Sequence, residues 1–570
     1  MGREYVQQKV TMASLIYALI TVASTLSPSI VSSLTSQTQR RPNFVFILAD
    51  DLDLTLGGAS SLPKTSRLIA SKGADLTNWF VHTPVCCSSR AEILTGKYFH
   101  NLKVSTPGKA YNEGCMHINV DSDPTCDFYA KDYFARYFKD MKYKVGVFGK
   151  HLNNYNTFPQ NVDRWLVNGG GDYINPSFTA ASTEVEPTRV RFENCTDSHG
   201  LPIPCYSTSI IGNASIAWIK DHLEVHGSKT PFFAYVALKA PHLQDGPGFP
   251  MAIPAPWYQN ATVGKEGAPR TPNYNASCPK HHWLVRQQSP LSTLESSKVD
   301  ELYRSRLRSL LSVDDLVEET IHTLDDLGII DSTYVIFTSD NGFRFGQFRM
   351  PEGKWSPYEH SLRVPFWIRG PGLAEGILRD DILGTHVDLM PTLLCLASGS
   401  EDGCIPSTMD GENLAPLLLN RSNLAAHRNV LLIEYMSGPV VRYQHIEDSY
   451  NNTFRGLRLI DPSLRAGFQN LKYIEFTDLR EDWNFTKAPL EVELFNLDRD
   501  PFEMENIAPR VPAELLVQLR QMLRKLFACS GESCRGVSIF APEEESSGQF
   551  RGSSSLHDIK LALGILDISS

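Results

Sequence analysis

The sequence predicts an α/β protein with a large, mostly parallel sheet, followed by a smaller antiparallel sheet. Two observations lead to this fold class. Four continuous apolar runs, typical of strands buried on both faces, are spread along the chain up to residue 338. Each run is followed closely by polar side chains. An open parallel sheet binds its ligands at the carboxyl ends of its strands, so the fold class also predicts where these polar side chains meet.

Each apolar run and its polar residues can be read directly from the chain. They are 44–49 with Asp50 and Asp51, 145–148 with Lys150, 232–237 with His242, and 334–338 with Asp340 and Asn341. Between the last two runs, leucine, valine and isoleucine recur at helical spacing over 307–324, and Gly328 fits the end of that helix. Arg304, Arg306 and Arg308 stand at its start, and we expect them on its solvated face rather than at a polyanion site.

The chain changes in character from about residue 423. Three shorter runs, 430–435, 471–476 and 492–497, are typical of half-exposed strands, and 511–527 is typical of a helix. We interpret this region as a smaller antiparallel sheet covered by one helix. The segment from 531 onward carries runs of glutamate and serine, and we expect it to be loosely ordered.

The N-terminus has the pattern of a secretory signal. Arg3 and Lys9 precede a short apolar run at 15–23, and small residues follow up to Ser33. An uncleaved membrane anchor is the alternative, although the run is short for a bilayer span, and no later segment is long and apolar enough. The predicted organisation is a signal peptide (1–34), an α/β domain (35–422), a C-terminal antiparallel-sheet domain (423–530) and a loosely ordered tail (531–570).

The composition limits the classes of partner. The chain of 570 residues has a net charge of −10, with 54 basic against 64 acidic side chains. Such a protein presents no overall positive field, which argues against binding of duplex nucleic acid. An anionic ligand would have to be captured by local cations.

Glycosylation and cysteine patterns agree with a secreted protein. The asparagines in N-x-S/T sequons are Asn194, Asn213, Asn260, Asn275, Asn420, Asn451 and Asn484. The chain has eleven cysteines, and extracellular cysteines normally pair. If Cys86 is set aside, all ten others can pair. Cys195 with Cys205 and Cys529 with Cys534 are plausible, but the sequence does not fix the connectivity.

One short stretch carries the most chemical information. Residues 86–90 read Cys-Cys-Ser-Ser-Arg, just before a predicted helix, and residues 95–96 read Thr-Gly. Cys86 would lie at the N-terminus of that helix, where backbone N–H groups favour an anion. Asp50, Asp51, Asp340 and Asn341 offer the hard oxygen ligands that suit Ca²⁺ or Mg²⁺. A turn or a helix cap is the alternative for each acidic pair taken alone.

The basic side chains form a second set. Arg90, Lys150, His242 and Lys354 could bind an anion and stabilise the charge that develops on a leaving oxygen. Each one taken singly is more often a surface group.

In this order the motifs resemble the sulfatase family over roughly residues 42–425, and more weakly to 510. Within the family, the resemblance is to N-acetylglucosamine-6-sulfatases and extracellular heparan endosulfatases. The passages that carry it are 42–51, 56–58, 86–91, 94–98, 100–101, 149–150, 240–242, 282–287, 311–318, 338–342, 346–348 and 364–365.

The resemblance implies an alkaline-phosphatase-like core over the α/β domain. It implies that a formylglycine-generating enzyme oxidises Cys86 to formylglycine, the catalytic nucleophile. It implies one Ca²⁺ held by Asp50, Asp51, Cys86, Asp340 and Asn341, and a sulfate pocket of Arg90, Lys150, His242 and Lys354. One hydroxyl of the hydrated aldehyde would attack sulfur, with His242 or Lys354 as proton donor, and the other would expel sulfate.

The implied substrate is a sulfated sugar, specifically the 6-O-sulfate of glucosamine units in glycosaminoglycan-like polysaccharides. The implied location is the secretory pathway, in the lysosome or outside the cell. Ser88 stands where the family signature has proline, and Arg344 where the nearest relatives have histidine. The alternatives are an arylsulfatase of other specificity, a phosphodiesterase or phosphonate hydrolase on the same fold, and an inactive glycan-binding protein.

Overall fold

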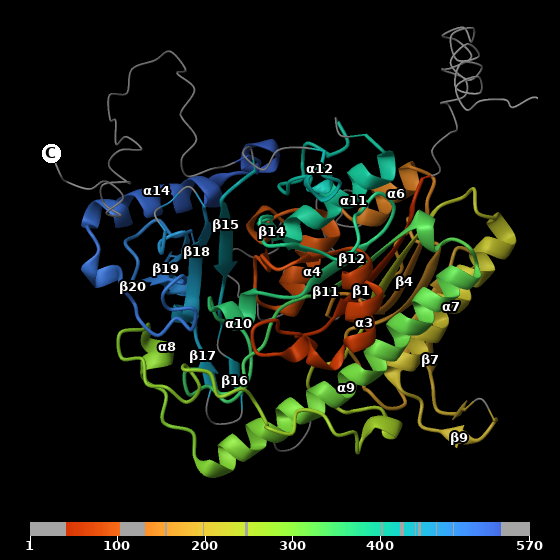
Figure 1. Ribbon diagram of the computed structural model, residues 1–570, viewed down its shortest axis with the longest axis horizontal. Coiled ribbons are helices and arrows are strands. Elements are labelled where there is room, and N and C mark those ends of the chain that lie inside the picture. Colours follow the sequence, from red (N-terminus) through yellow and green to blue (C-terminus); the bar gives the residue numbers. More distant parts are fainter. Residues whose placement is uncertain are drawn as a thin grey trace, which may run out of the picture. The chain divides into compact units, whose positions relative to one another are not determined.

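A ten-stranded mixed sheet forms the centre of the computed structural model (Figure 1). The described residues are 41–102, 132–153, 157–197, 199–244, 249–400, 403–421, 427–438, 440–442, 446–462, 464, 466–482 and 484–536. In sheet order the strands are β13 (Ile377–Arg379), β2 (Ala74–Leu76), β12 (Phe366–Arg369), β11 (Thr333–Ser339), β1 (Asn43–Ala49), β10 (Phe232–Ala237), β4 (Lys144–Lys150), β5 (Arg164–Asn168), β6 (Ser177–Ser182) and β7 (Val185–Arg191).

The four predicted apolar runs are confirmed as neighbouring strands. They form β11, β1, β10 and β4, which lie side by side and run parallel. In the register of the sheet, Val45 pairs with Ala234 on one side and with Val335 on the other. Among the ten strands described, β12 and β6 run opposite to the central strands, and both lie towards the edges of the sheet. The carboxyl ends of the four central strands therefore open onto one edge, as the sequence predicts.

Helices cover both faces of this sheet. The alternating side chains of β1 divide between two apolar clusters, with Phe44 and Phe46 in one and Val45 and Ile47 in the other. The first cluster is completed by α4 (Cys86–Thr95), α6 (Phe134–Asp140) and α11 (Leu389–Ser398). On the opposite face lie α3 (Pro63–Leu68), α7 (Ser207–His226) and the long α9 (Thr293–Asp326), as Figure 1 shows.

The long helix α9 confirms one prediction and overturns another. It ends at Asp326, and Gly328 follows with φ +65°, as the sequence predicts. The expectation that Arg304, Arg306 and Arg308 share a solvated face is wrong. Arg304 and Arg308 are half-buried and bind Glu301, whereas Arg306 is buried. Each helical residue turns the side chain by about 100°, so residues two apart lie on opposite sides of the helix.

The second sheet is antiparallel, also as predicted. Its strands, in sheet order, are β15 (Val430–Tyr435), β18 (Thr453–Ile460), β19 (Asn470–Thr477) and β20 (Glu491–Asn496). Helix α14 (Ala513–Ala528) packs on it through Leu515, Leu519, Leu523 and Leu526. The sequence missed β18 because Arg455 and Arg458 interrupt its apolar pattern. Both arginines are buried, and they pair with Glu475 and Glu359.

The remaining elements are short. They are α8 (Trp283–Arg286), α10 (Glu359–Leu362), α12 (Ala415–Leu418), α13 (Leu479–Asp482), and the strand pairs β3 (Trp79–Phe80) with β14 (Gly384–Thr385), β8 (Cys195–Thr196) with β9 (Pro202–Ile203), and β16 (Val440–Arg442) with β17 (Ile446–Asp448). The described residues from 42 to 536 belong to one compact unit. The predicted signal peptide (1–34) lies outside the described residues. Of the predicted tail (531–570), only 531–536 are described, and they include a 3-10 helix (Gly531–Cys534).

The predicted disulfides Cys195–Cys205 and Cys529–Cys534 are confirmed, and Cys395–Cys404 is a further one. Cys87 is also disulfide-bonded. The expectation that every cysteine except Cys86 pairs is wrong at Cys278, which is buried and carries a free thiol.

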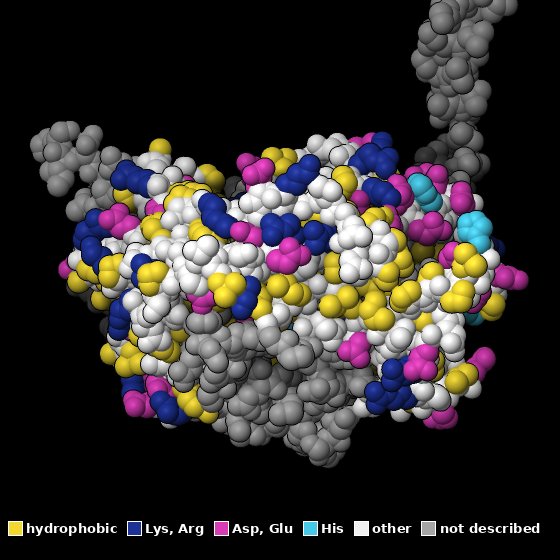
Figure 2. All heavy atoms as spheres, turned by 90° about the horizontal axis from the view of Figure 1, so that it is seen from below, with side chains coloured by type: hydrophobic (Ala, Val, Ile, Leu, Met, Phe, Trp, Pro, Cys, Tyr) yellow, Lys and Arg dark blue, Asp and Glu magenta, His cyan; other side chains and the backbone are white. Residues whose placement is uncertain are grey.

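Two surface properties bear on the sequence predictions. Among the helices that the structure describes, none has the combination of length and hydropathy needed to cross a bilayer. Figure 2 shows one face of the molecule, on which basic and acidic side chains are interspersed. Neither sign of charge dominates the visible part of that face.

Candidate active site

The polar residues after the central strands meet at one place. Asp50 and Asp51 follow β1, Lys150 ends β4, His242 lies in the loop after β10, and Asp340 and Asn341 follow β11. Helix α4 supplies Cys86 and Arg90 from the next layer, and Lys354 comes from the loop before α10. The structure thus brings together every residue that the sequence assigned to the metal and anion sites.

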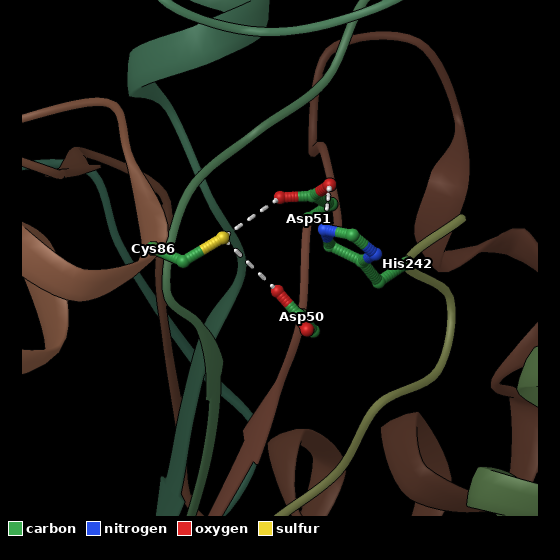
Figure 3. Close-up of side chains that lie close together, drawn as sticks. All are labelled: Asp50, Asp51, Cys86 and His242. Carbon is green, nitrogen blue, oxygen red and sulfur yellow. Dashed lines mark hydrogen bonds and ion pairs between the residues drawn. The ribbon is translucent and has the colours of Figure 1, made fainter. Parts of the chain in front are cut away.

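Cys86 is the first residue of α4 and is buried. Its Sγ atom lies 3.4 Å from Oδ1 of Asp50 and 3.7 Å from Oδ1 of Asp51 (Figure 3). The Nζ atom of Lys354 lies 2.7 Å from the same sulfur. Burial raises the pKa of Cys86 to about 12, although Lys150 and Lys354 oppose this shift. The side chain is therefore a neutral, unpaired thiol at pH 7, unlike the neighbouring disulfide-bonded Cys87.

Asp50 and Asp51 are buried carboxylates that stay ionised. Asp50 accepts a hydrogen bond of 2.6 Å from Nζ of Lys150, and Asp51 accepts hydrogen bonds from Lys354 and from Nδ2 of Asn341. Burial alone would raise the pKa of Asp50, but Lys150 and the other nearby cations hold that pKa well below its usual range. The same balance, with Lys354 as the main cation, lowers the pKa of Asp51 to about 2.

Arg90 joins two strand ends from the helix above them. Its Nε atom donates to Oδ2 of Asp340 at 2.8 Å, and one terminal nitrogen donates to the main-chain oxygen of Lys150 at 2.7 Å. The other carboxylate oxygen of Asp340 accepts the backbone N–H of Asp51 at 2.9 Å. The guanidinium is completely buried, so this arrangement fixes the spacing of β1, β4 and β11 at their carboxyl ends.

His242 stands on the more open side of the group. Its side chain is 17% exposed, compared with 2% for Asp51. Nε2 lies 3.6 Å from Oδ2 of Asp51, and Nδ1 lies 2.7 Å from the main-chain oxygen of Leu243. Burial lowers the pKa of His242 to about 3, in spite of Asp50 and Asp51, so the ring is neutral at pH 7. With Nδ1 donating to Leu243, Nε2 is the acceptor that faces the site.

The donor set fits a hard divalent cation. Ligand atoms of Asp50, Asp51, Cys86 and His242 lie within 4.8 Å of one another. The Oδ1 atom of Asn341 is buried and has no hydrogen-bond partner among the described residues. A cation would satisfy that oxygen, and carboxylate and amide oxygens are the ligands that Ca²⁺ prefers. His242 belongs to this group, although the sequence assigns it to the sulfate pocket and to proton donation rather than to the metal. Asp340, which the sequence assigns to the metal, is not in the group, and its carboxylate accepts hydrogen bonds from Arg90 and from two backbone N–H groups.

Two buried arginines that the sequence did not assign to the site bind its backbone. Arg344 donates to the main-chain oxygen of Lys354, and Arg306 donates to the main-chain oxygens of Asp51 and Pro241. The sequence holds one indication that Arg306 is buried: helical spacing places it on the side of the helix opposite Arg304 and Arg308. For Arg344, the sequence offers no local pattern that indicates its contact with Lys354.

A second cluster of ionisable groups lies outside the site. Glu434 on β15 receives Nε2 of His82 at 3.0 Å and Nδ1 of His100 at 2.9 Å. His82 also binds the main-chain oxygen of Leu432 through Nδ1. Of the two contacts with Glu434, the one from His100 is a hydrogen bond, whereas Nε2 of His82 faces Glu434 at ion-pair distance without hydrogen-bond geometry. We interpret the cluster as a link between the antiparallel sheet and the segments that flank α4.

The sequon asparagines differ in exposure. Those that are exposed are Asn194, Asn213, Asn260, Asn420 and Asn484. Asn275 and Asn451 are half-buried, and the side-chain amide of Asn275 exchanges hydrogen bonds with the backbone of Leu291. Glycosylation therefore stays a prediction, with the five exposed positions as the better acceptors.

Comparison with known proteins agrees with this geometry. A family model described as Sulfatase matches residues 42–400. N-acetylglucosamine-6-sulfatase of Homo sapiens is 32% identical over 531 residues, which cover 88% of this chain and 87% of that protein. The extracellular sulfatase SULF-1 homolog of Drosophila melanogaster is 33% identical over 391 residues, which cover 68% of this chain and 32% of that protein.

Solved structures share the fold. One is a protein in complex with its substrate D-glucosamine-2-N,6-O-disulfate, with a TM-score of 0.63, 22% identity, and coverage of 85% of this chain and 97% of that one. Another is a phosphonate monoester hydrolase from Silicibacter pomeroyi, with a TM-score of 0.57, 20% identity, and coverage of 86% and 96%. The extent of the family match and of the alignments to the curated relatives identifies this chain as a member of the sulfatase family and a sulfuric ester hydrolase.

Proposed function

We propose that the protein removes the 6-O-sulfate from N-acetylglucosamine or glucosamine units of glycosaminoglycan-like polysaccharides. The observation that carries the chemistry is the position of Cys86, a free thiol set between two ionised aspartates and the ammonium of Lys354. The sugar preference rests on the curated relatives, several of which are named N-acetylglucosamine-6-sulfatase.

Cys86 acts after its oxidation to formylglycine. In the hydrated aldehyde, one hydroxyl would attack sulfur, so that the S–O bond to the sugar breaks and the sugar alcohol leaves. Loss of the proton from the other hydroxyl would then break the carbon–oxygen bond to the sulfate group, releasing sulfate and restoring the aldehyde. The unmodified thiol carries no hydroxyl and cannot expel sulfate in this way. Since Cys86 is buried in the folded chain, we propose that a formylglycine-generating enzyme acts before folding is complete.

One Ca²⁺ would be held by Asp50, Asp51, Asp340 and Asn341 together with residue 86. The cation would supply a fixed positive charge against the sulfate oxygens. Arg90 and Asp340 hold one another in place, so the anion meets a preorganised set of charges rather than mobile ones.

The remaining residues orient the ester and move protons. Lys150 binds Asp50 and faces the same centre as Lys354. Lys354 touches residue 86 directly and is the proposed proton donor to the leaving sugar oxygen. His242 presents its unprotonated Nε2 to the site, which suits the acceptance of a proton from a hydroxyl at residue 86.

The proposed route to the site of action is the secretory pathway, with a cleaved signal peptide, N-linked glycans and a lysosomal or extracellular destination. The relatives include extracellular sulfatases.

The test is a comparison of substrates with purified, secreted protein. We expect hydrolysis of N-acetylglucosamine-6-sulfate and of 6-sulfated heparan oligosaccharides, and none by a Cys86→Ala variant produced in parallel. Release of sulfate by Cys86→Ala at the wild-type rate would contradict the nucleophile assignment.

A second function, phosphonate monoester hydrolysis, is favoured by the fold shared with the Silicibacter pomeroyi enzyme. An aryl phosphonate monoester should therefore be assayed beside an aryl sulfate. A larger kcat/KM on the phosphonate than on every sulfate ester would replace the proposed function with this one.

A further inference from the structure

Arg306 lies behind the candidate active site, on the side of α9 that faces the sheet. It is 2% exposed, whereas most arginines keep their guanidinium in water. One terminal nitrogen donates to the main-chain oxygen of Pro241 at 2.9 Å, and the other donates to the main-chain oxygen of Asp51. One guanidinium therefore holds the end of β1 and the loop after β10 together. Those two segments carry Asp51 and His242.

The backbone of Asp51 needs such support. Its φ angle is +70°, in the left-handed region that non-glycine residues rarely adopt. A conformation of this kind costs about 1–3 kcal/mol and persists only where the surroundings fix it. Two contacts do so here. The N–H of Asp51 donates to Asp340, and its carbonyl accepts from Arg306. The strain directs the Asp51 carboxylate towards Cys86 and His242.

The surroundings offset part of the cost of burying the guanidinium; burial still lowers the pKa of Arg306, against the opposing effect of Asp51. Its central carbon lies 4.1 Å from the ring centroid of Phe343 and 5.2 Å from that of Phe345, within the range of cation–π attraction. Asp51 and Asp53 are the negative charges that act on it most strongly. A lysine at this position would carry the same charge, but its single nitrogen lacks the planar fork that reaches two carbonyls at once.

We propose that Arg306 is a positioning residue of this sulfatase, which fixes Asp51 and the loop of His242 relative to each other by clamping their backbones. This inference rests on the proposed function, in which Asp51 is a metal ligand and His242 accepts a proton. Arg306 touches neither the substrate nor residue 86 in this role. It sets the geometry of the groups that do.

The test compares Arg306→Lys and Arg306→Ala with Arg304→Ala. Arg304 is a matched control on the same helix, and its guanidinium binds Glu301. We expect both Arg306 variants to bind Ca²⁺ about 10-fold to 100-fold more weakly, as measured by calorimetric titration. We expect kcat on a 6-sulfated substrate to fall about 100-fold in Arg306→Ala, with a smaller change in KM. Peptide mass spectrometry should show residue 86 converted to the same extent in every variant.

The outcomes separate the two proposals. Ca²⁺ affinity and kcat equal to those of Arg304→Ala, in folded Arg306 variants, would overturn the positioning role. If Arg306→Ala does not fold, Arg306→Lys decides, because full activity with one ammonium would also overturn it. Failure of both Arg306 variants to fold, while Arg304→Ala folds, would assign a purely structural role instead. If the wild type hydrolyses no sulfate ester, the proposed function fails, and the ratio of Ca²⁺ affinities still tests Arg306.

Discussion

The Nζ atom of Lys354 lies 2.7 Å from the Sγ atom of Cys86, although 268 positions separate the two residues in the chain. Lys354 lies in the loop that precedes α10, so the contact requires that this loop keep its position. Arg344 binds the backbone of the loop. Arg344 is buried, and its guanidinium donates to the main-chain oxygen of Lys354. Its backbone also pairs with that of Gly353. Arg344 is thus connected to residue 86 through Lys354.

Replacement of Lys354 by alanine should reduce kcat by about 10²–10⁴-fold, because a positioned proton donor contributes about that much. The substitution also removes the cation that contacts both Asp51 and residue 86. The measurement is kcat on a 6-sulfated sugar, corrected for the converted fraction of residue 86. A kcat within about 2-fold of wild type would exclude a catalytic role for Lys354.

Replacement of Arg344 by alanine should have a smaller effect, about 100-fold on kcat, because it displaces Lys354 without removing it. The two substitutions should not be additive, since Arg344 acts through Lys354. The double variant Arg344→Ala with Lys354→Ala is therefore expected to be no slower than Lys354→Ala alone. Multiplicative effects in the double variant would show that Arg344 acts by another route.

Replacement of Ser88 by proline should leave the fold intact and should not lower the conversion of Cys86. Ser88 is in the first turn of α4, where backbone N–H groups have no partner within the helix and proline is tolerated. Its hydroxyl is buried and has no hydrogen-bond partner among the described residues, so its loss leaves no group unpaired. Peptide mass spectrometry across residue 86 measures the conversion. A clear fall in the converted fraction would contradict this prediction.

Much of the site could be predicted because its signals are local in the sequence. An apolar run that ends in Asp50 and Asp51 identifies both a buried strand and its functional end. The same holds for the run that ends in Asp340 and Asn341, and the parallel order of β1 and β11 then brings the two pairs together. Hydrophobic periodicity over 307–324 similarly located the C-terminal half of α9 and its end just before Gly328, but not its beginning at Thr293.

The parts that sequence reasoning missed depend on charges buried in pairs. The sequence pattern placed Arg306 on the solvated face of the helix because an arginine near two others is usually exposed. The carbonyl groups that accept its N–H groups belong to segments distant in the sequence, so no local pattern indicates them. Strand β18 was missed for the same reason, since Arg455 and Arg458 resemble surface residues until their partners Glu475 and Glu359 are known. Hydrophobic patterns locate the core, but they do not reveal which charged side chains have a buried partner.

Removal of the metal should abolish turnover without unfolding the protein. Chelation by EGTA takes away the charge that balances the Asp50 and Asp51 carboxylates, and activity is expected to fall by at least about 100-fold. Added Ca²⁺ should restore it, and Asp50→Asn should lose both Ca²⁺ binding and turnover. Full activity after exhaustive chelation, with residual metal excluded by mass spectrometry, would contradict the assignment of a metal centre.

Two buried groups outside the active site, Glu92 and His82, should make the stability of the protein depend on pH. Burial raises the pKa of Glu92 on α4 to about 8, compared with an ordinary value of 4.5. Burial opposes protonation of His82, but Glu434 outweighs it and raises the pKa of His82 from 6.5 to about 9. In both cases the folded state holds its proton more tightly than the unfolded state does. Both groups therefore favour folding at low pH and lose that contribution as pH rises.

Glu92 and His82 release their protons over different pH ranges, so their contributions to stability can be told apart. Glu92 should lower the free energy of unfolding between about pH 4.5 and pH 8, and His82 between about pH 6.5 and pH 9. Each released proton contributes a slope of about 1.4 kcal/mol per pH unit. The difference in unfolding free energy between wild type and Glu92→Gln, followed by urea denaturation, should change steadily from pH 5 to pH 8 and then level off. Glu514→Gln, at an exposed position on α14, is the matched control. If the difference in unfolding free energy for Glu92→Gln depends on pH as little as that for the control, the Glu92 carboxyl has an ordinary pKa in the folded protein and the prediction is wrong.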